Sequence, residues 1–112
     1  MNDEHAIEAE IQAKGKTAPR ITPTHIDAQI VGEYWGRASD LFPDHPYHAS
    51  LETLTIAVLV LKNGFTVIGE SACASPENYD AEIGSKIARE NARQKIWALE
   101  GYALKTRLHE AK

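Results

Sequence analysis

Three basic residues and one aromatic residue recur at helical spacing near the C-terminus: Lys86, Arg89, Arg93 and Trp97. On a helix they fall within about 80° of one another, so they form one basic stripe. A stripe of this kind can hold a phosphate or an anionic nucleotide, because guanidinium groups pair with phosphate oxygens and an indole ring stacks on a base. We therefore predict that the basic stripe binds a small anionic ligand.

The basic stripe also has an alternative interpretation as a solvated helix face. Glu82 and Glu90 each lie four residues from Lys86, and Glu90 lies three residues from Arg93. Intrahelical ion pairs at these spacings use up basic charge, and they are the commoner arrangement. A further possibility is that the arginines pair with Glu70 on a neighbouring strand.

A second polar group lies in a proline-containing loop and consists of Asp44, His45 and His48, with Asp40 nearby. Imidazole and carboxylate groups suit zinc and harder metal ions. Their spacing matches no recognised metal-binding motif, so we predict a polar loop with no metal and no cofactor. The ring-bearing residues His45, Tyr47 and His48 make the loop at 36–50 a candidate for target specificity.

Residues that could act in catalysis are sparse. Glu70 could be a carboxylate with a raised pKa, and Ser71 and Cys73 are nucleophile types, but no histidine is near them in sequence. The phosphate-binding loop, the dinucleotide glycine motif and the HExxH motif are absent from the sequence. We predict that the protein is not an enzyme.

Two β-rich runs in the middle of the chain predict a hairpin. Residues 54–61 and 65–70 are rich in branched apolar residues, and Asn63-Gly64 lies between them. Asn-Gly favours a two-residue type I′ turn, in which both central residues need positive φ. With this turn, Val60 pairs with Val67.

One long helix should follow the hairpin. Ser75-Pro76-Glu77 is typical of a helix start, and the helix is predicted from about residue 76 or 79 to residue 109. At ~1.5 Å per residue it is longer than a ten-residue strand, so its C-terminal end should extend past the hairpin. A ridge of small residues would allow close packing: Gly84, Ala88 and Ala92.

The first 20 residues are predicted to be a flexible or weakly helical leader. Residues 3–14 can form a short helix with Asp3 as its cap, a Glu10–Lys14 pair on its surface and Gly15 at its end. Only two isoleucines give this helix an apolar side, so we expect that it is loosely attached or docks on a partner subunit.

The remaining residues, 21–112, are predicted to be a single α+β domain. Thr22 is the expected cap of a further helix, with Pro23 in its first position, and the apolar spacing predicts a helix over 23–40. The predicted architecture therefore consists of N-terminal helices, an antiparallel β-hairpin and a long C-terminal helix packed on the hairpin.

Composition narrows the class of protein. The chain carries a net charge of −4, with 43% hydrophobic and 25% charged residues, as in an ordinary soluble protein. Nucleic acid is a less favoured partner, because proteins that bind it usually carry a basic excess. A single cysteine and the absence of an apolar run of ~18 residues predict a cytoplasmic protein without a membrane span.

Both faces of the predicted hairpin are apolar. A two-stranded hairpin is marginal in water, and the predicted helices can cover only one of its faces. We therefore predict a homo-oligomer, a dimer or larger, in which a second copy covers the remaining surface.

Three stretches of the sequence carry a resemblance to a known family: 17–23, 59–73 and 75–102. They resemble small tailed-phage and prophage proteins named after a gene product of coliphage N-four and gene sixty-six of Shigella phage Sf-six. The similarity covers about residues 17–108. This family is functionally uncharacterised, so the resemblance assigns no site residue.

The resemblance implies a phage-encoded protein that acts in the cytoplasm of the bacterial host. By analogy with other small phage proteins, it would be a non-enzymatic binder that inhibits a host factor or sequesters a small nucleotide-like signal. The alternative is a nucleic-acid-binding protein that uses the basic stripe.

Overall fold

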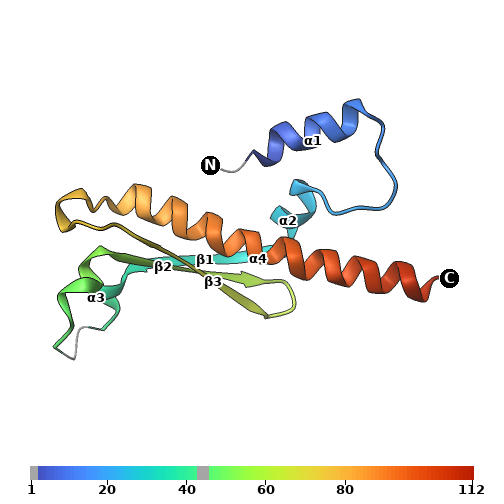
Figure 1. Cartoon of the computed structure of the whole chain (residues 1–112). Helices are drawn as coiled ribbons and strands as arrows, with labels where there is room; N and C mark the ends of the chain where they lie inside the picture. The colour runs from blue at the N-terminus through green and yellow to red at the C-terminus, as the bar shows by residue number, and fades with distance from the viewer. Residues whose placement is uncertain (1–2, 43–45) are drawn as a thin grey trace.

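The computed structural model describes residues 3–42 and 46–112 and confirms the predicted α+β class. Its elements, with η for a short 3-10 helix, are α1 (Glu4–Ala13), α2 (Pro23–Gln29), β1 (Ile30–Arg37), α3 (Ala38–Leu41), η1 (Ala49–Thr53), β2 (Leu54–Leu61), β3 (Thr66–Ala72), η2 (Pro76–Asn78) and α4 (Ala81–Glu110). The strands form one antiparallel sheet in the order β1-β2-β3. The long helix α4 packs along one face of this sheet, as predicted (Figure 1).

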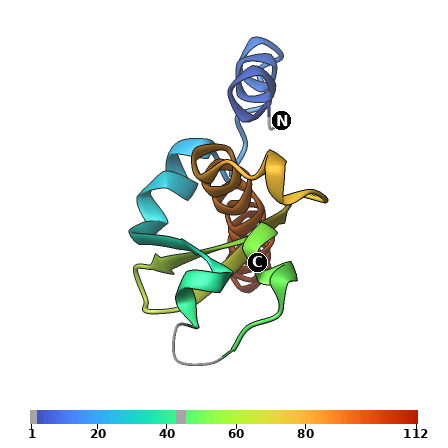
Figure 2. The same ribbon diagram turned by 90° about the vertical axis from the view of Figure 1, so that its left-hand side faces the viewer.

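The helices lie on one side of the sheet for most of its length. In both Figure 1 and Figure 2, α4 lies between the sheet and α1, and α2 lies beside α4. The short elements α3 and η1 lie at the end of the sheet away from the β2–β3 turn. The sheet therefore has one face covered by α4 and one face that is largely open.

The prediction of one helix over 23–40 is wrong in its second half. The helix starts as predicted, because the Thr22 hydroxyl accepts a hydrogen bond from the His25 N–H (3.0 Å) and Pro23 follows the cap. It ends at Gln29, and the next eight residues form β1, an edge strand paired with β2.

The composition of β1 explains this change from helix to strand. Val31, Tyr34 and Trp35 favour extended backbone, whereas Gly32 and Gly36 weaken a helix. A strand here also satisfies the backbone groups of β2, which would otherwise be an exposed sheet edge. The predicted two-stranded hairpin is therefore part of a three-stranded sheet.

The hairpin register differs by one residue from the predicted one. Val60 pairs with Thr66, and Leu59 pairs with Val67. This shift matters because neighbouring residues of a strand point to opposite faces of the sheet. In the observed register, Leu59 and Val67 both face α4, whereas the predicted Val60–Val67 pair would have mixed the two faces.

A three-residue turn causes the shift. The Leu61 N–H donates to the Phe65 carbonyl (2.8 Å), and Gly64 has a φ of +89°. Asn63 does not adopt the positive φ that a type I′ turn needs; its side-chain oxygen instead accepts the Phe65 N–H (2.9 Å). This arrangement is the common alternative of a turn followed by a left-handed glycine.

The core lies between α4, α2 and the covered face of the sheet. Its largest fully buried apolar side chains are Ile26, Leu59 and Ile96. The predicted ridge of small residues on α4 packs on the sheet: a Cβ at Gly69 would lie 2.2 Å from the Ala88 carbonyl oxygen. The backbones of α4 and β3 are therefore in direct contact, and no larger residue fits at position 69.

The start of α4 lies later than predicted. Asp80 caps the helix by accepting the Ile83 N–H (2.9 Å), whereas Ser75 makes no side-chain cap and precedes the separate helix η2. Tyr79 and Asp80 have extended backbone, which separates the two helices.

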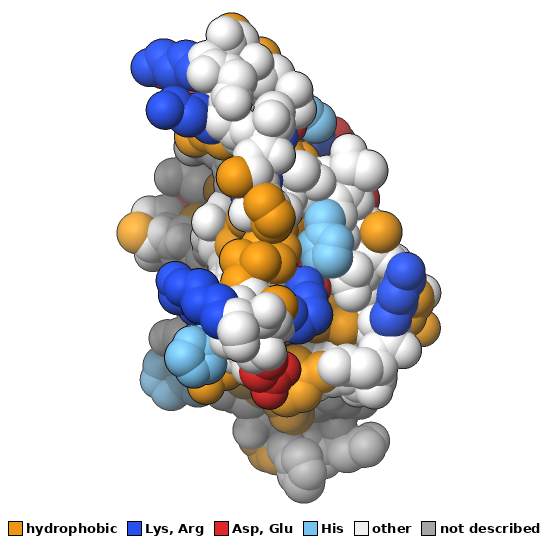
Figure 3. Space-filling view, turned by 90° about the vertical axis from the view of Figure 1, so that its right-hand side faces the viewer, with side chains coloured by type: hydrophobic (Ala, Val, Ile, Leu, Met, Phe, Trp, Pro, Cys, Tyr) orange, Lys and Arg blue, Asp and Glu red, His pale blue; other side chains and the backbone are white. Residues whose placement is uncertain are grey.

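The C-terminal part of α4 extends past the sheet, as predicted. The 30 residues of the whole helix α4 span ~45 Å, whereas the eight residues of β2 span ~26 Å. Viewed from this end of the molecule, hydrophobic side chains gather in the middle of the surface, with lysine and arginine side chains beside them (Figure 3). The exposed hydrophobic residues of this end include Phe65, Leu99 and Tyr102.

The first helix, α1, closely matches the predicted helix. Lys14 pairs with Glu10 (3.1 Å), and Gly15 ends the helix with a φ of +67°. Asp3 precedes the helix but makes no side-chain cap, contrary to the prediction. None of the residues of α1 is buried.

Candidate functional site

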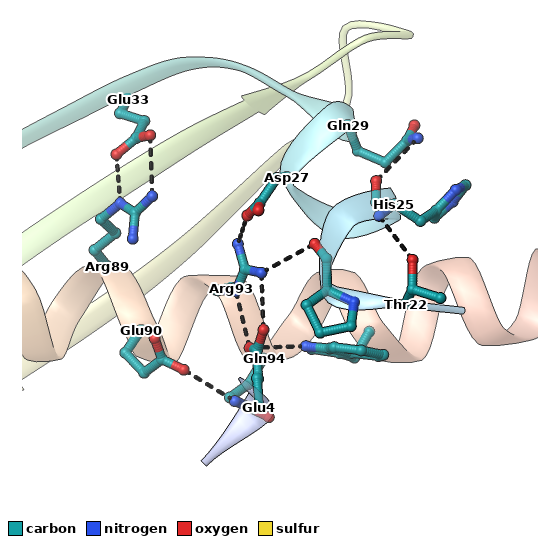
Figure 4. Close-up of polar contacts among 12 residues, drawn as sticks. Glu4, Thr22, His25, Asp27, Gln29, Glu33, Arg89, Glu90, Arg93 and Gln94 are labelled. Carbon is teal, nitrogen blue, oxygen red and sulfur yellow. Dashed lines mark hydrogen bonds and ion pairs between the residues drawn. The ribbon is translucent and has the colours of Figure 1, made fainter. Parts of the chain in front are cut away.

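The structure divides the basic stripe into two parts with different partners. Arg89 faces Glu33 of β1, whereas Arg93 lies between Glu4 of α1 and Asp27 of α2 (Figure 4). Lys86 lines the same cleft as Arg89, and Trp97 donates to the same carboxylate as Arg93. Neither arginine contacts Glu70, the partner considered from the sequence, because Glu70 lies on the opposite face of β3 from the helix. Binding of a small anionic ligand at the stripe stays a prediction.

Arg93 is the centre of an ion-pair network. It donates from Nε and Nη2 to the two carboxylate oxygens of Glu4 (2.8 Å each), from Nη1 to Asp27 (2.7 Å), and from Nη2 to the Pro23 carbonyl (3.3 Å) (Figure 4). Its side chain is only 8% exposed and that of Glu4 13%, whereas that of Asp27 is 62% exposed. Arg93 therefore joins α1, α2 and α4.

Among the donors to the carboxylate of Glu4 are two side chains of α4. Besides Arg93, the indole Nε1 of Trp97 donates to it (3.0 Å). The hydrogen bonds from Arg93 hold the pKa of the Glu4 carboxyl below its ordinary value, although burial opposes this shift. Glu4 is therefore ionised at neutral pH and binds these two donors as an anion.

A groove of about 260 Å³ lies between α1 and the rest of the protein. Its walls are mostly apolar and include Ile7 and Ile11 from α1, facing Ile21, Pro23 and Trp97. We call it the α1 groove. The Glu4–Arg93 pair lies at one end of it.

Arg89 is held by β1 rather than by its own helix. It donates to both carboxylate oxygens of Glu33, and both side chains are less than half exposed (43% and 45%). This contact lowers the pKa of the Glu33 carboxyl and raises that of Arg89. Lys86 makes the intrahelical pair expected from the sequence, with Glu82 at 3.0 Å, and is well exposed.

A small cleft lies beside the Glu33–Arg89 pair. Trp35, Ser85, Lys86 and Arg89 contribute to its lining, and its volume is about 130 Å³. Ligand pockets usually measure ~300–1,000 Å³. The cleft therefore suits a phosphate-sized group and not a whole nucleotide.

The other candidate residues do not converge. Glu70 and Ser71 point to opposite faces of β3, and the Cys73 thiol contacts the carbonyls of Thr53 (3.8 Å) and Ser75 (3.5 Å). His48 accepts the Ser50 N–H at the start of η1 (3.1 Å). Asp44 and His45 lie outside the described residues; within 3–42 and 46–112 no group of three metal-ligating side chains occurs.

Sequence reasoning missed the acidic partners of the stripe: Glu4, Asp27 and Glu33. They lie 56 to 89 residues from their arginines, beyond the range of any local spacing rule. It also missed Trp35, which was assigned to a helix and lies on β1 beside the cleft. The alternation of apolar and polar residues in β1 is too weak to identify it alone.

The sheet face that points away from α4 is a further surface with apolar side chains, which we call the open sheet face. It consists of the side chains of the three strands that point away from α4, which are mostly apolar and include two polar residues of β3: Tyr34, Leu54, Ile56, Val58, Val60, Thr66, Ile68, Glu70 and Ala72. Tyr34 is 64% exposed and Ile68 49%. One end of this face is covered, where Leu41 of α3 lies over Gly36.

Comparison with known proteins identifies the family. No helix within residues 3–42 and 46–112 has the length and hydropathy needed to cross a membrane. No curated protein and no solved structure matches the chain. The sequence family described as Phage protein (N4 Gp49/phage Sf6 gene 66) matches residues 21–108, a span that holds α2, the sheet, the basic stripe and nearly all of α4. The chain therefore belongs to the N4 Gp49/phage Sf6 gene 66 family of phage proteins.

Proposed function

We propose that this phage protein is a non-enzymatic binding protein that acts as a homo-oligomer on a protein of the bacterial host cytoplasm. The observation that supports this proposal is the open sheet face, an apolar surface without a covering layer. Sheets with one open face usually present polar residues on it. An apolar open face of this kind marks a protein interaction site.

A second copy of the chain is the occupant that we assign to the open sheet face. In the described part of the chain, fourteen large hydrophobic side chains are exposed, whereas nine hydrophobic residues are buried and four of these are alanines. So small a core needs additional burial of apolar surface for stability. A second copy can provide this burial at all times, whereas a target protein provides it only when bound. Two copies related by a two-fold axis through β2 would place equivalent side chains together.

Oligomeric state in solution tests this assignment. Light scattering coupled to size exclusion should show a dimer or larger species at micromolar concentration. Val58→Lys places a charge at the centre of the open sheet face and should give a monomer, whereas Thr24→Lys adds the same charge on α2 and should not. If Val58→Lys unfolds, Ile68→Lys at the exposed edge replaces it. A monomeric wild-type protein would contradict the proposal.

Binding of a small nucleotide-like signal is a second candidate function. The cleft beside Trp35 supports recognition of a phosphate group of such a signal, because Trp35, Lys86 and Arg89 line one site next to the Glu33 carboxylate that pairs with Arg89. Calorimetric titration with inorganic phosphate and with nucleotides would test it: phosphate should bind, and Arg89→Met should abolish that binding. Equal binding by wild type and variant would remove this candidate.

Nucleic-acid binding is the least supported of these functions. Arg89 and Arg93 are each paired with carboxylates, and the chain carries a net charge of −4. A gel-shift assay at low and physiological salt distinguishes it, because nucleic-acid binding would be strong at low salt and weaken steeply. We expect no shift under either condition.

A further inference from the structure

The α1 groove is closed by a helix whose first turn is held by an ion pair to α4. Glu4, in the first turn of α1, forms a bidentate pair with the nearly buried guanidinium of Arg93. The apolar side of α1 adds little, because no residue of the helix is buried and Ile7 is 57% exposed. A ten-residue helix has little stability of its own in water. Charge, and not packing, therefore holds α1 over the groove.

The linker end of α1 is also held by charge. Arg20 donates to both carboxylate oxygens of Glu8 (2.7 and 2.6 Å). Between the two ion pairs the apolar walls of α1 and the domain leave the groove of about 260 Å³ unfilled. This is the arrangement of a segment that can leave and return without disturbing the core.

The groove beneath α1 is built to recognise a carboxylate next to apolar side chains. With α1 moved away, the guanidinium of Arg93 and the indole N–H of Trp97 point at the position of the Glu4 carboxylate. Ile21 and Pro23 provide the adjoining apolar wall. The groove residues that lie outside α1, among them Ile21, Pro23 and Trp97, are within the span matched by the family, 21–108, whereas α1 precedes it.

We propose that α1 is a releasable strap and that the α1 groove binds an acidic amphipathic helix of the protein partner. The occupant carries a glutamate in its first turn and apolar residues three and seven positions later, which is the spacing of Glu4, Ile7 and Ile11. This proposal rests on the proposed protein-binding function and specifies the chemistry of the partner. The strap competes with the partner for one guanidinium.

Competition sets the expected affinities. A tethered strap acts at an effective concentration in the millimolar range, so it masks the groove from a weakly binding helix. Glu4→Lys places a cation beside Arg93 and should release the strap while leaving the groove intact. The released groove should then bind an acidic helix about ten- to a hundredfold more tightly than wild type, the range expected for a charge-assisted hydrogen bond.

Fluorescence anisotropy on the full chain can test this. The probe is a labelled peptide of residues 3–14, titrated with the wild-type protein and with the Glu4→Lys variant. A peptide carrying Glu4→Gln is the matched control for the carboxylate and should lose the gain in affinity. Adding Arg93→Met to the Glu4→Lys variant should also remove the gain in affinity for the probe. Circular dichroism would confirm that the double variant is folded.

Three outcomes would overturn the proposal. The first is equal affinity of wild type and Glu4→Lys for the probe, and the second is equal affinity for the acidic and the Gln-containing peptides. The third is an oligomeric wild type with a monomeric Glu4→Lys variant, because that result would mean that α1 of a second copy occupies the groove. If the wild type is monomeric and the Glu4→Lys variant still binds the probe more tightly than wild type, only the proposed dimer through the open sheet face is contradicted.

Discussion

Replacing Arg93 with methionine separates a structural role of the basic stripe from a role in binding. Methionine keeps much of the apolar stem of the side chain and removes the guanidinium. Breaking a fully buried ion pair usually costs ~3–5 kcal/mol, because a charge is left unpaired in the interior. The question is whether the carboxylates of Glu4 and Asp27 stay buried after the change.

The geometry indicates a smaller cost. Asp27 is already 62% exposed, and Glu4 lies on a helix that buries no residue, so both carboxylates can reach water. What is lost is the set of charge-assisted hydrogen bonds that joins α1 and α2 to α4. We expect Arg93→Met to lower the free energy of unfolding by ~1–3 kcal/mol.

Arg89→Met is the matched control on the same helix. The Glu33–Arg89 pair is nearly half exposed on both sides, and pairs of this kind contribute only ~0.2–1 kcal/mol. Urea denaturation followed by circular dichroism gives both values. A loss of ~4 kcal/mol or more for Arg93→Met would show that Glu4 stays buried and that α1 does not swing out. Equal small losses for both variants would show that Arg93 has no structural role.

Acidification should release α1, because the Arg93 guanidinium lowers the pKa of the Glu4 carboxyl. The stabilisation is complete above the ordinary glutamate pKa of about 4.5 and is lost as the pH falls through the lowered pKa of Glu4, and the indole N–H resonance of Trp97 should report the release. Gly69→Ala should lower the free energy of unfolding by more than ~3 kcal/mol, because the new Cβ meets the backbone of α4. Gly101→Ala should raise it by ~0.5–1 kcal/mol, because the space around Gly101 is open, and thermal melts compare the two variants. Gly64→Ala should lower the urea midpoint by the equivalent of ~1–2 kcal/mol because of its positive φ, and an unchanged midpoint would contradict the observed turn.

Local signals in the sequence determined the class of fold and most helix boundaries. Thr22 and Pro23 start α2, Gly15 ends α1, and the long periodic stretch without proline forms α4. These features depend on interactions within one or two helical turns. They are therefore readable without knowledge of what packs against them.

Only the tertiary structure decided where β1 and the hairpin register lie. Residues 30–37 carry apolar residues that fit both a helix and a strand, and the free edge of β2 selects the strand. Likewise Asn63-Gly64 fits a two-residue or a three-residue turn, and packing of Leu59 and Val67 against α4 selects the longer one. In each case a long-range contact overrides a local preference.

The partners of the basic stripe were also set by the tertiary structure. The spacing on α4 places Lys86 beside Glu82, and that pair forms as the sequence predicts. Arg93 instead pairs with Glu4, 89 residues away, because α1 lies on the side of α4 opposite the sheet (Figure 1). An ion pair depends on distance in space, and sequence spacing specifies that distance only within a single helix or strand.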